Sequence, residues 1–166
     1  WDTEKYVKEY NFLLNNDKSN VNWYILRYAD VLLMYAEALN EWHHGPNNAA
    51  LAALNMVRRR GYGLPYNEAN TTVDLKSTSY EGFQEYIRNE RAYELAFEGN
   101  RRQDLIRWGI YYETIVNTYI KLIGWYPEAN YVAYQYTQKN KHELLPIPAR
   151  DMSLMENFKQ NQGWGD

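Results

Sequence analysis

The charged segment 87–108 constrains the fold more than any other part of this 166-residue chain. Its carboxylates Glu90, Glu94 and Glu98 recur every four residues, which places them near one face of a helix. An apolar band at helical spacing lies beside them and consists of Ile87, Ala92, Leu95, Ala96 and Phe97. Gly99 is a natural stop for this helix, because a residue without Cβ enters the left-handed conformation easily. The segment therefore predicts two helices, the second one short, joined at a corner.

Charges of both signs around this corner predict a structural network of ion pairs. The planar guanidinium of arginine binds a carboxylate through two parallel hydrogen bonds, so arginines after the glycine can neutralise the glutamates before it. The predicted members are Glu90, Arg91, Glu94, Glu98, Arg101, Asp104 and Arg107. A glycosidase is the alternative, with one carboxylic acid protonating the leaving group and another attacking or activating water. We prefer the structural network, and assign no catalytic residue, because catalytic carboxylates usually come from separate elements that face a cleft.

Composition excludes several classes of function. The net charge of −3 argues against a nucleic-acid partner. The absence of cysteine excludes disulfides, thiol chemistry and cysteine-based metal sites. No apolar run approaches the roughly 20 residues that span a bilayer. The length corresponds to one domain, 1–166, and the start at Trp1 without a signal peptide favours a piece of a longer protein.

Two helices are predicted in the first half of the chain. Between Val21 and Trp42, apolar residues fall on one helix face, namely Leu26, Ala29, Leu32, Leu33, Ala36 and Leu39. Asn47 or Asn48 is predicted to cap a second helix from Ala49 to Arg60, and its three terminal arginines complement the helix dipole. His43 and His44 separate the two helices, but no third ligand stands at metal-binding spacing, so no metal is assigned.

These two helices match a tetratricopeptide-like unit, whose period is roughly 34 residues. The small residues Ala36 and Ala50 allow the partner helices to approach closely, and Pro65 follows the stop. Stacked helix pairs need at least about three repeats to bury a core, so one clear unit implies degenerate neighbours in this chain or upstream of it. We therefore expect a mainly α fold in which such pairs, connected by long irregular loops, form the scaffold.

Further along, Ser79 is predicted to cap the central helix. Another helix is predicted from Ile110 to Ile123 and is stopped by Gly124. Its inward residues are expected to be Tyr112, Ile115, Val116, Tyr119 and Leu122. The motif 142–148 is expected to be extended, since residues before proline avoid the helical region. One helical turn is expected from Asp151 to Met155, and the polar tail 157–164 is expected to wrap the surface.

From Trp125 onward the helical period is lost and aromatic residues cluster. Tyr134 and Tyr136 alternate as on a strand. Aromatic rings in a loop suit a sugar-stacking platform, because ring faces cover the apolar faces of pyranoses; the alternative is that they pin the loop onto the helices. The candidate ligand contacts are Trp125, Tyr126, Tyr131, Tyr134 and Tyr136.

Several blocks of the sequence together resemble the SusD/RagB family. These blocks are 27–40 with 53–58, then 89–108, then 144–150 leading to Gln160, Asn161 and Gly163. They occur in family order over nearly the whole chain and match only the carboxy-terminal portion of such a protein. Gln162 stands where the terminal motif usually has Pro, and Asn100 stands where His is frequent.

The resemblance implies a SusD-like carboxy-terminal domain, covering 1–166, of a non-catalytic lipoprotein exposed on the outer membrane of Bacteroidetes. Such proteins bind glycans, as starch, other polysaccharides or oligosaccharides, and pass them to a SusC-like TonB-dependent transporter for nutrient uptake. Attachment to the membrane would come only from a lipid anchor on the amino-terminal part. The resemblance implies no cofactor. The rival interpretation is a tetratricopeptide-like scaffold for protein interaction, which would have no affinity for sugars.

Overall fold

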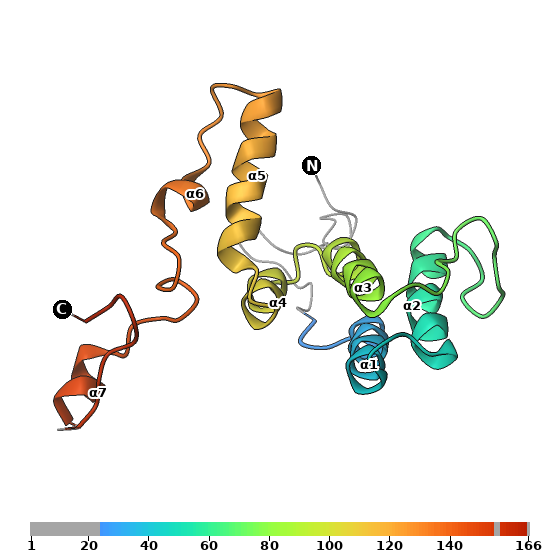
Figure 1. Ribbon diagram of the computed structural model, residues 1–166, viewed down its shortest axis with the longest axis horizontal. Coiled ribbons are helices and arrows are strands. Elements are labelled where there is room, and N and C mark those ends of the chain that lie inside the picture. The colour runs from blue at the N-terminus through green and yellow to red at the C-terminus, as the bar shows by residue number, and fades with distance from the viewer. Residues whose placement is uncertain (1–23, 155–156, 166) are drawn as a thin grey trace, which may run out of the picture. The chain divides into compact units, whose positions relative to one another are not determined.

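The computed structural model describes residues 24–154 and 157–165, and within these ranges it contains seven α-helices and no strand. The chain forms two compact units, the first ending at Gly99 and the second beginning at Asn100 (Figure 1). The first carries α1 (Tyr28–His43), α2 (Asn48–Gly61) and α3 (Tyr80–Glu94). The second carries α4 (Arg101–Arg107), α5 (Tyr111–Trp125), α6 (Val132–Tyr136) and α7 (Ala149–Leu154). The prediction of a mainly α fold is confirmed.

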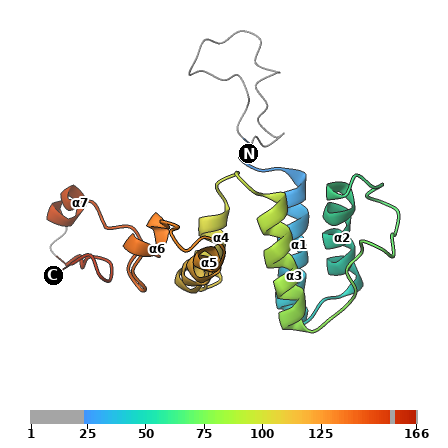
Figure 2. The same ribbon diagram turned by 90° about the horizontal axis from the view of Figure 1, so that it is seen from above.

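In the first unit, α1 packs against both α2 and α3, and all three lie side by side in Figure 2. Their shared core consists of Leu33, Ala36, Ala50, Ala53, Leu54, Val57, Phe83 and Ile87. Ala36 and Ala50 are fully buried, so α1 and α2 meet through small side chains as the sequence predicts. The helix pair is therefore tetratricopeptide-like, with α3 completing its core.

The predicted helix starts are confirmed where the structure describes them. The side chain of Asn47 accepts a hydrogen bond from the backbone N–H of Ala50 at 2.8 Å, and Ser79 accepts one from Gly82 at 3.1 Å. These bonds satisfy backbone donors that the first turn of a helix leaves without partners. The predicted start of the first helix at Val21 lies outside the described residues, and α1 begins at Tyr28.

The connection between α2 and α3 is fixed onto α2 by polar side chains. Arg59 binds both oxygens of Asp74, with Nε–Oδ1 and Nη2–Oδ2 distances of 2.6 and 2.5 Å. The hydrogen bond from Arg59 holds the pKa of Asp74 below its usual value. The side-chain amide of Asn55 accepts a hydrogen bond from the backbone N–H of Leu75 at 2.8 Å and donates one to the backbone carbonyl of Leu75 at 3.0 Å. The arginines at the end of α2 thus do more than complement a helix dipole.

Three expectations for the helices after residue 87 need correction. The central helix ends at Glu94, earlier than predicted, although Gly99 does take the expected left-handed conformation, with φ 83°. Gly124 lies inside α5 and does not stop it. The alternating Tyr134 and Tyr136 belong to the short helix α6, not to a strand. In α5 Ile115 is buried, whereas the other predicted inward residues are half-buried.

The last segment of the second unit is held by side chains that bind backbone groups. The amide of Gln160 accepts from the N–H of Ile147 at 2.7 Å and donates to its carbonyl at 2.9 Å. Trp164 donates through Nε1 to the carbonyls of Lys141 and Leu144, both at 3.1 Å. A Cβ on Gly163 would lie 2.9 Å from the Cβ of Lys141, so this position requires glycine. The segments 144–150 and 160–163 are therefore held together by side-chain hydrogen bonds.

None of the helices in the described ranges combines the length and the apolar character needed to cross a bilayer.

Candidate functional site

The first candidate site is the carboxylate cluster, which we define as Glu90, Glu94 and Glu98. Glu90 and Glu94 lie on α3, Glu98 follows it, and all three are buried. Their spacing places them along one side of the helix and its extension, where burial in water-poor surroundings demands a positive partner for each carboxylate. The structure provides such partners within the first unit.

Arg27, which immediately precedes α1, binds the end of this cluster. Its Nε and Nη2 donate to the two carboxylate oxygens of Glu98, both at 2.8 Å, in the bidentate geometry that suits guanidinium. Arg27 also pairs with the carboxylate and the backbone carbonyl of Glu94. Burial disfavours the charged guanidinium, but the hydrogen bonds and charges of the two glutamates outweigh it, so the pKa of Arg27 is raised. This residue ties the start of α1 to the end of α3.

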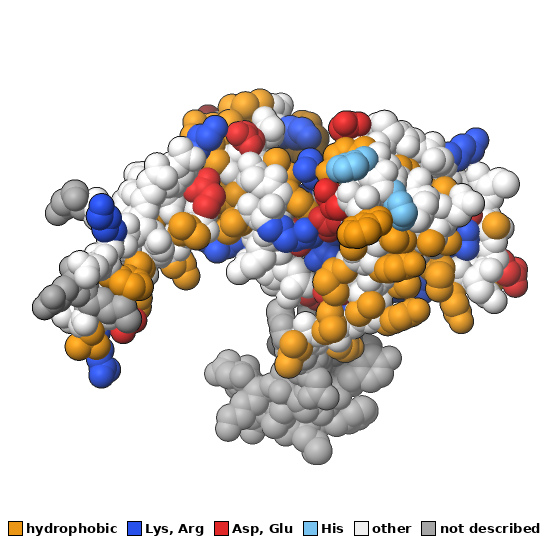
Figure 3. Space-filling view, turned by 60° about the horizontal axis from the view of Figure 1, so that its bottom comes forward, with side chains coloured by type: hydrophobic (Ala, Val, Ile, Leu, Met, Phe, Trp, Pro, Cys, Tyr) orange, Lys and Arg blue, Asp and Glu red, His pale blue; other side chains and the backbone are white. Residues whose placement is uncertain are grey.

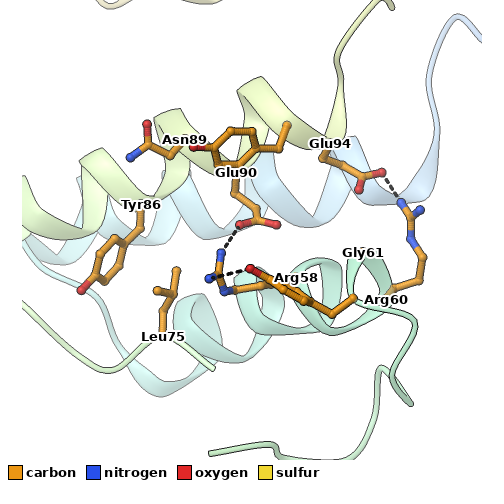
Figure 4. A pocket seen from close by; sticks show the side chains of 10 residues that line it. Arg58, Arg60, Gly61, Leu75, Tyr86, Asn89, Glu90 and Glu94 are labelled. Carbon is orange, nitrogen blue, oxygen red and sulfur yellow. Dashed lines mark hydrogen bonds and ion pairs between the residues drawn. The ribbon is translucent and has the colours of Figure 1, made fainter. Parts of the chain in front are cut away.

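Two arginines of α2 reach the same cluster from the other side. Figure 4 shows Arg58 directed toward Glu90 and Arg60 directed toward Glu94. The Nη1–Oε2 distance between Arg58 and Glu90 is 3.1 Å, and Arg58 Nε also donates to the carbonyl of Val73 at 2.6 Å. Burial raises the pKa of Glu90, and the hydrogen bond from Arg58 opposes this shift. The cluster therefore joins all three helices of the first unit.

The other predicted members of the network have separate positions. Arg91 pairs with Asp30 of α1 at 2.7 Å, and this buried pair is a second link between α1 and α3. In the second unit, Asp104 pairs with Arg107 one helical turn away at 3.0 Å, and the guanidinium of Arg101 lies 5.8 Å from the centre of the Trp108 ring. Pairing across Gly99 would join the two units, and it stays a prediction.

Sequence reasoning missed Arg27, Arg58 and Arg60 as partners of the glutamates. The expected partners were cations close to Glu94 in the sequence, whereas Arg27 stands 67 residues before Glu94. The available signal was the run of three arginines that ends α2, which is more positive charge than a helix terminus needs. The geometry favours a structural role for the cluster, because a guanidinium group pairs with each of its three carboxylates and neutralises the charge that a nucleophile would need.

The second candidate site is the aromatic group, which we define as Trp125, Tyr126, Tyr131, Tyr134 and Tyr136. It occupies the end of α5, the connection to α6 and α6 itself. Trp125, Tyr126 and Tyr136 are 76%, 66% and 71% exposed, so most of their surface is open. Tyr131 is half-buried and immediately precedes α6, and Tyr134 stacks on Tyr119 of α5 with ring centres 4.0 Å apart. The group thus contains three open rings and one ring, that of Tyr134, that packs α6 onto α5.

Comparison with known proteins gives consistent matches. The model of the SusD family matches residues 1–164. The chain is 37% identical to SusD-like protein P25 of Formosa agariphila over 147 residues, which are 86% of this chain and 25% of that protein. It is 30% identical to SusD-like protein P2 of the same organism over 151 residues, covering 89% of this chain and 26% of that protein.

Solved structures match as well. A SusD homolog from Bacteroides thetaiotaomicron superposes with a TM-score of 0.81 and 55% identity, covering 92% of this chain and 29% of that chain. A SusD superfamily protein from Parabacteroides distasonis gives a TM-score of 0.59 and 26% identity, covering 90% and 29%. The chain spans about a quarter of the length of the curated relatives it matches.

Proposed function

Because this chain belongs to the SusD family, we propose that it is the carboxy-terminal portion of a non-catalytic glycan-binding protein of the bacterial cell surface. In this proposal the full-length protein carries a lipid anchor in the outer membrane. It holds starch-like or other polysaccharides, or oligosaccharides released from them, for a SusC-like TonB-dependent transporter. The helices of the first unit act as scaffold, and no cofactor takes part.

The observation that carries the proposal at the level of residues is the exposure of Trp125, Tyr126 and Tyr136. Exposed aromatic rings that cluster, unlike single exposed apolar residues, are typical of surfaces that contact a ligand or another protein. Indole and phenol rings offer flat apolar faces with a polar tip, which matches a sugar ring that has apolar C–H faces and a polar rim. The three rings lie on one short stretch of chain, between the end of α5 and the end of α6.

The test is a titration of the full-length protein with starch and a panel of other polysaccharides, followed by tryptophan fluorescence. We expect Trp125→Ala to weaken binding by about tenfold, equivalent to about 1.4 kcal/mol. Tyr136→Ala should act in the same direction. Tyr66→Ala is the control, since Tyr66 is 55% exposed but lies in the connection between α2 and α3 of the first unit.

Each possible result separates the proposal from its rivals. A correctly folded full-length protein that responds to no glycan would contradict glycan binding and favour the protein-interaction scaffold. Glycan binding that is unchanged in both variants would support the glycan-binding function but show that the aromatic group is not the binding site. Turnover of a glycoside that disappears in Glu94→Gln would instead establish the hydrolase.

A further inference from the structure

A hollow of about 710 Å³ lies within the first unit, between the end of α2 and one face of α3. Its volume is in the range of about 300–1,000 Å³ that small-molecule sites have. The side chains that matter for its chemistry are Arg58, Tyr62, Tyr86, Asn89, Glu90 and Tyr93. Figure 4 shows the labelled members of this lining arranged around the space between α2 and α3.

The charges that line the hollow compensate one another. Arg58 pairs with Glu90 and Arg60 pairs with Glu94, so two cations face two anions from opposite helices. A strongly charged ligand would meet an opposing charge beside each attractive one. The hollow therefore favours a neutral ligand that forms hydrogen bonds.

Glu90 offers an acceptor that the described part of the chain does not use. The residue is only 7% exposed, and its Oε2 accepts the hydrogen bond from Arg58 at 3.1 Å. Within residues 24–154 and 157–165, its other oxygen, Oε1, accepts none. Since Oε1 is open to solvent in the hollow, a ligand hydroxyl that replaces water there can donate to it. The exposed amide of Asn89, one position earlier on α3, adds a donor and an acceptor.

Tyrosine rings supply the apolar part of the lining. Tyr62 and Tyr93 are 60% and 72% exposed, whereas Tyr86 is half-buried and packs edge-on against Phe83 of the core. The guanidinium of Arg58 lies over the Tyr62 ring at 5.2 Å from its centre, which restrains that ring. Exposed phenol rings beside a carboxylate and an amide can contact the apolar face and the hydroxyl rim of one sugar ring.

We propose that this hollow binds one neutral pyranose unit, with a sugar hydroxyl donating to Glu90 Oε1 and the sugar ring packed on Tyr62 or Tyr93. The proposal rests on the glycan-binding function but assigns a site of its own, formed by the first unit alone. The competing occupant is another part of the full-length polypeptide, whose backbone N–H could satisfy the same oxygen. The experiment distinguishes the two.

The full-length protein is mixed in turn with the methyl pyranosides of glucose, galactose and mannose, and saturation-transfer NMR reports contact with the sugar protons. We expect a signal from at least one glycoside, and a reduction of about tenfold in affinity in Tyr93→Ala or Tyr62→Ala. Tyr24→Ala is the matched control, because Tyr24 is 49% exposed and does not line the hollow. Glu90→Gln tests the acceptor directly, and its thermal midpoint shows whether the variant still folds.

A second measurement asks whether the hollow is open in the full-length protein. This chain has no cysteine, so Tyr93→Cys introduces a single thiol in this part of the molecule, and a maleimide should label it. A thiol that resists labelling until the protein is denatured means that the polypeptide itself fills the hollow, which overturns the proposal. Glycoside signals that are absent, or unchanged in both tyrosine variants, overturn it too. Polysaccharide binding that persists in those cases leaves the proposed function intact.

Discussion

At the scale of single residues, the first unit depends on charges that are removed from water. Glu94 and Glu98 are buried, and Arg27 contacts both. Transferring such ions from water is costly, so the arrangement contributes stability only while every carboxylate keeps its partner. Arg27 also fixes the orientation of the two glutamates, because its planar guanidinium group donates hydrogen bonds in fixed directions. One residue before α1 therefore sets where the end of α3 lies.

Removing this partner should destabilise the fold strongly. Arg27→Met keeps much of the apolar stem but leaves Glu98 without its bidentate partner, and we expect a loss of about 3 kcal/mol in the free energy of unfolding. Urea denaturation at neutral pH measures it. Arg150→Met is the control, since Arg150 is exposed, and it should change stability by less than about 0.5 kcal/mol. Equal effects of the two substitutions would show that the Arg27 pairs are merely solvated.

Asp74 gives a prediction that depends on pH. Its pKa is lowered by the hydrogen bond from Arg59, so the folded protein binds a proton here less readily than the unfolded chain does. The stability from this pair is present above the unfolded pKa of about 3.9 and is lost as pH falls through the lower folded pKa. Asp74→Asn should therefore lower the thermal midpoint at neutral pH, and this deficit should shrink as the pH approaches about 3. A deficit that stays constant over this range would contradict the linkage.

At the scale of elements, the contact of α1 with α2 depends on two alanines that have no exposed surface. Ala36→Leu inserts three carbon atoms where the helices meet and should cost about 1–3 kcal/mol through overpacking. Ala52→Leu is the matched control on α2, because Ala52 is exposed. Thermal denaturation of both variants measures the difference. Two variants with the same midpoint would mean that the helices separate easily to accept the larger side chain.

The same elements show how far the sequence predicts the fold. The bodies of α1 and α2 and the caps at Asn47 and Ser79 were predictable, because periodic apolar residues and side-chain caps act within a few residues of each other. The helix α6 was not, because the alternation of Tyr134 and Tyr136 resembles a strand, whereas stacking on Tyr119 of α5 accompanies a helical turn. Tertiary contact thus outweighed local pattern.

The candidate sites were predictable to different extents for the same reason. The burial of Glu90, Glu94 and Glu98 follows from their spacing beside apolar residues, but their partners could not be read from neighbouring positions. Arg27 and Arg60 come from other helices or their flanks, and only the packing of α1 and α2 on α3 brings them to Glu94. For the aromatic group, the sequence indicates which rings cluster but not which of them stay exposed.

At the scale of the whole molecule, the exposed side of α1 is unusually apolar. A stripe at helical spacing consists of Tyr28, Val31, Met34, Tyr35, Ala38 and Trp42, all of them exposed. Figure 3, in which the lower side of Figure 1 is turned toward the viewer, shows hydrophobic side chains gathered on this side of the first unit. Contiguous apolar surface of this kind marks a contact with another surface. The chain spans about a quarter of its curated relatives, so the rest of such a protein is long enough to supply that contact.

The isolated 166-residue chain should therefore behave differently from the full-length protein. We expect the chain alone to bind a hydrophobic dye and to self-associate with increasing concentration in sedimentation velocity, because its α1 stripe meets only water. Tyr35→Lys places a charge in the middle of the stripe and should reduce both effects. Asn117→Lys adds the same charge at an exposed position of α5 and should change neither. A chain that stays monomeric and binds no dye, or two lysine variants that behave alike, would show that the stripe is not a contact surface.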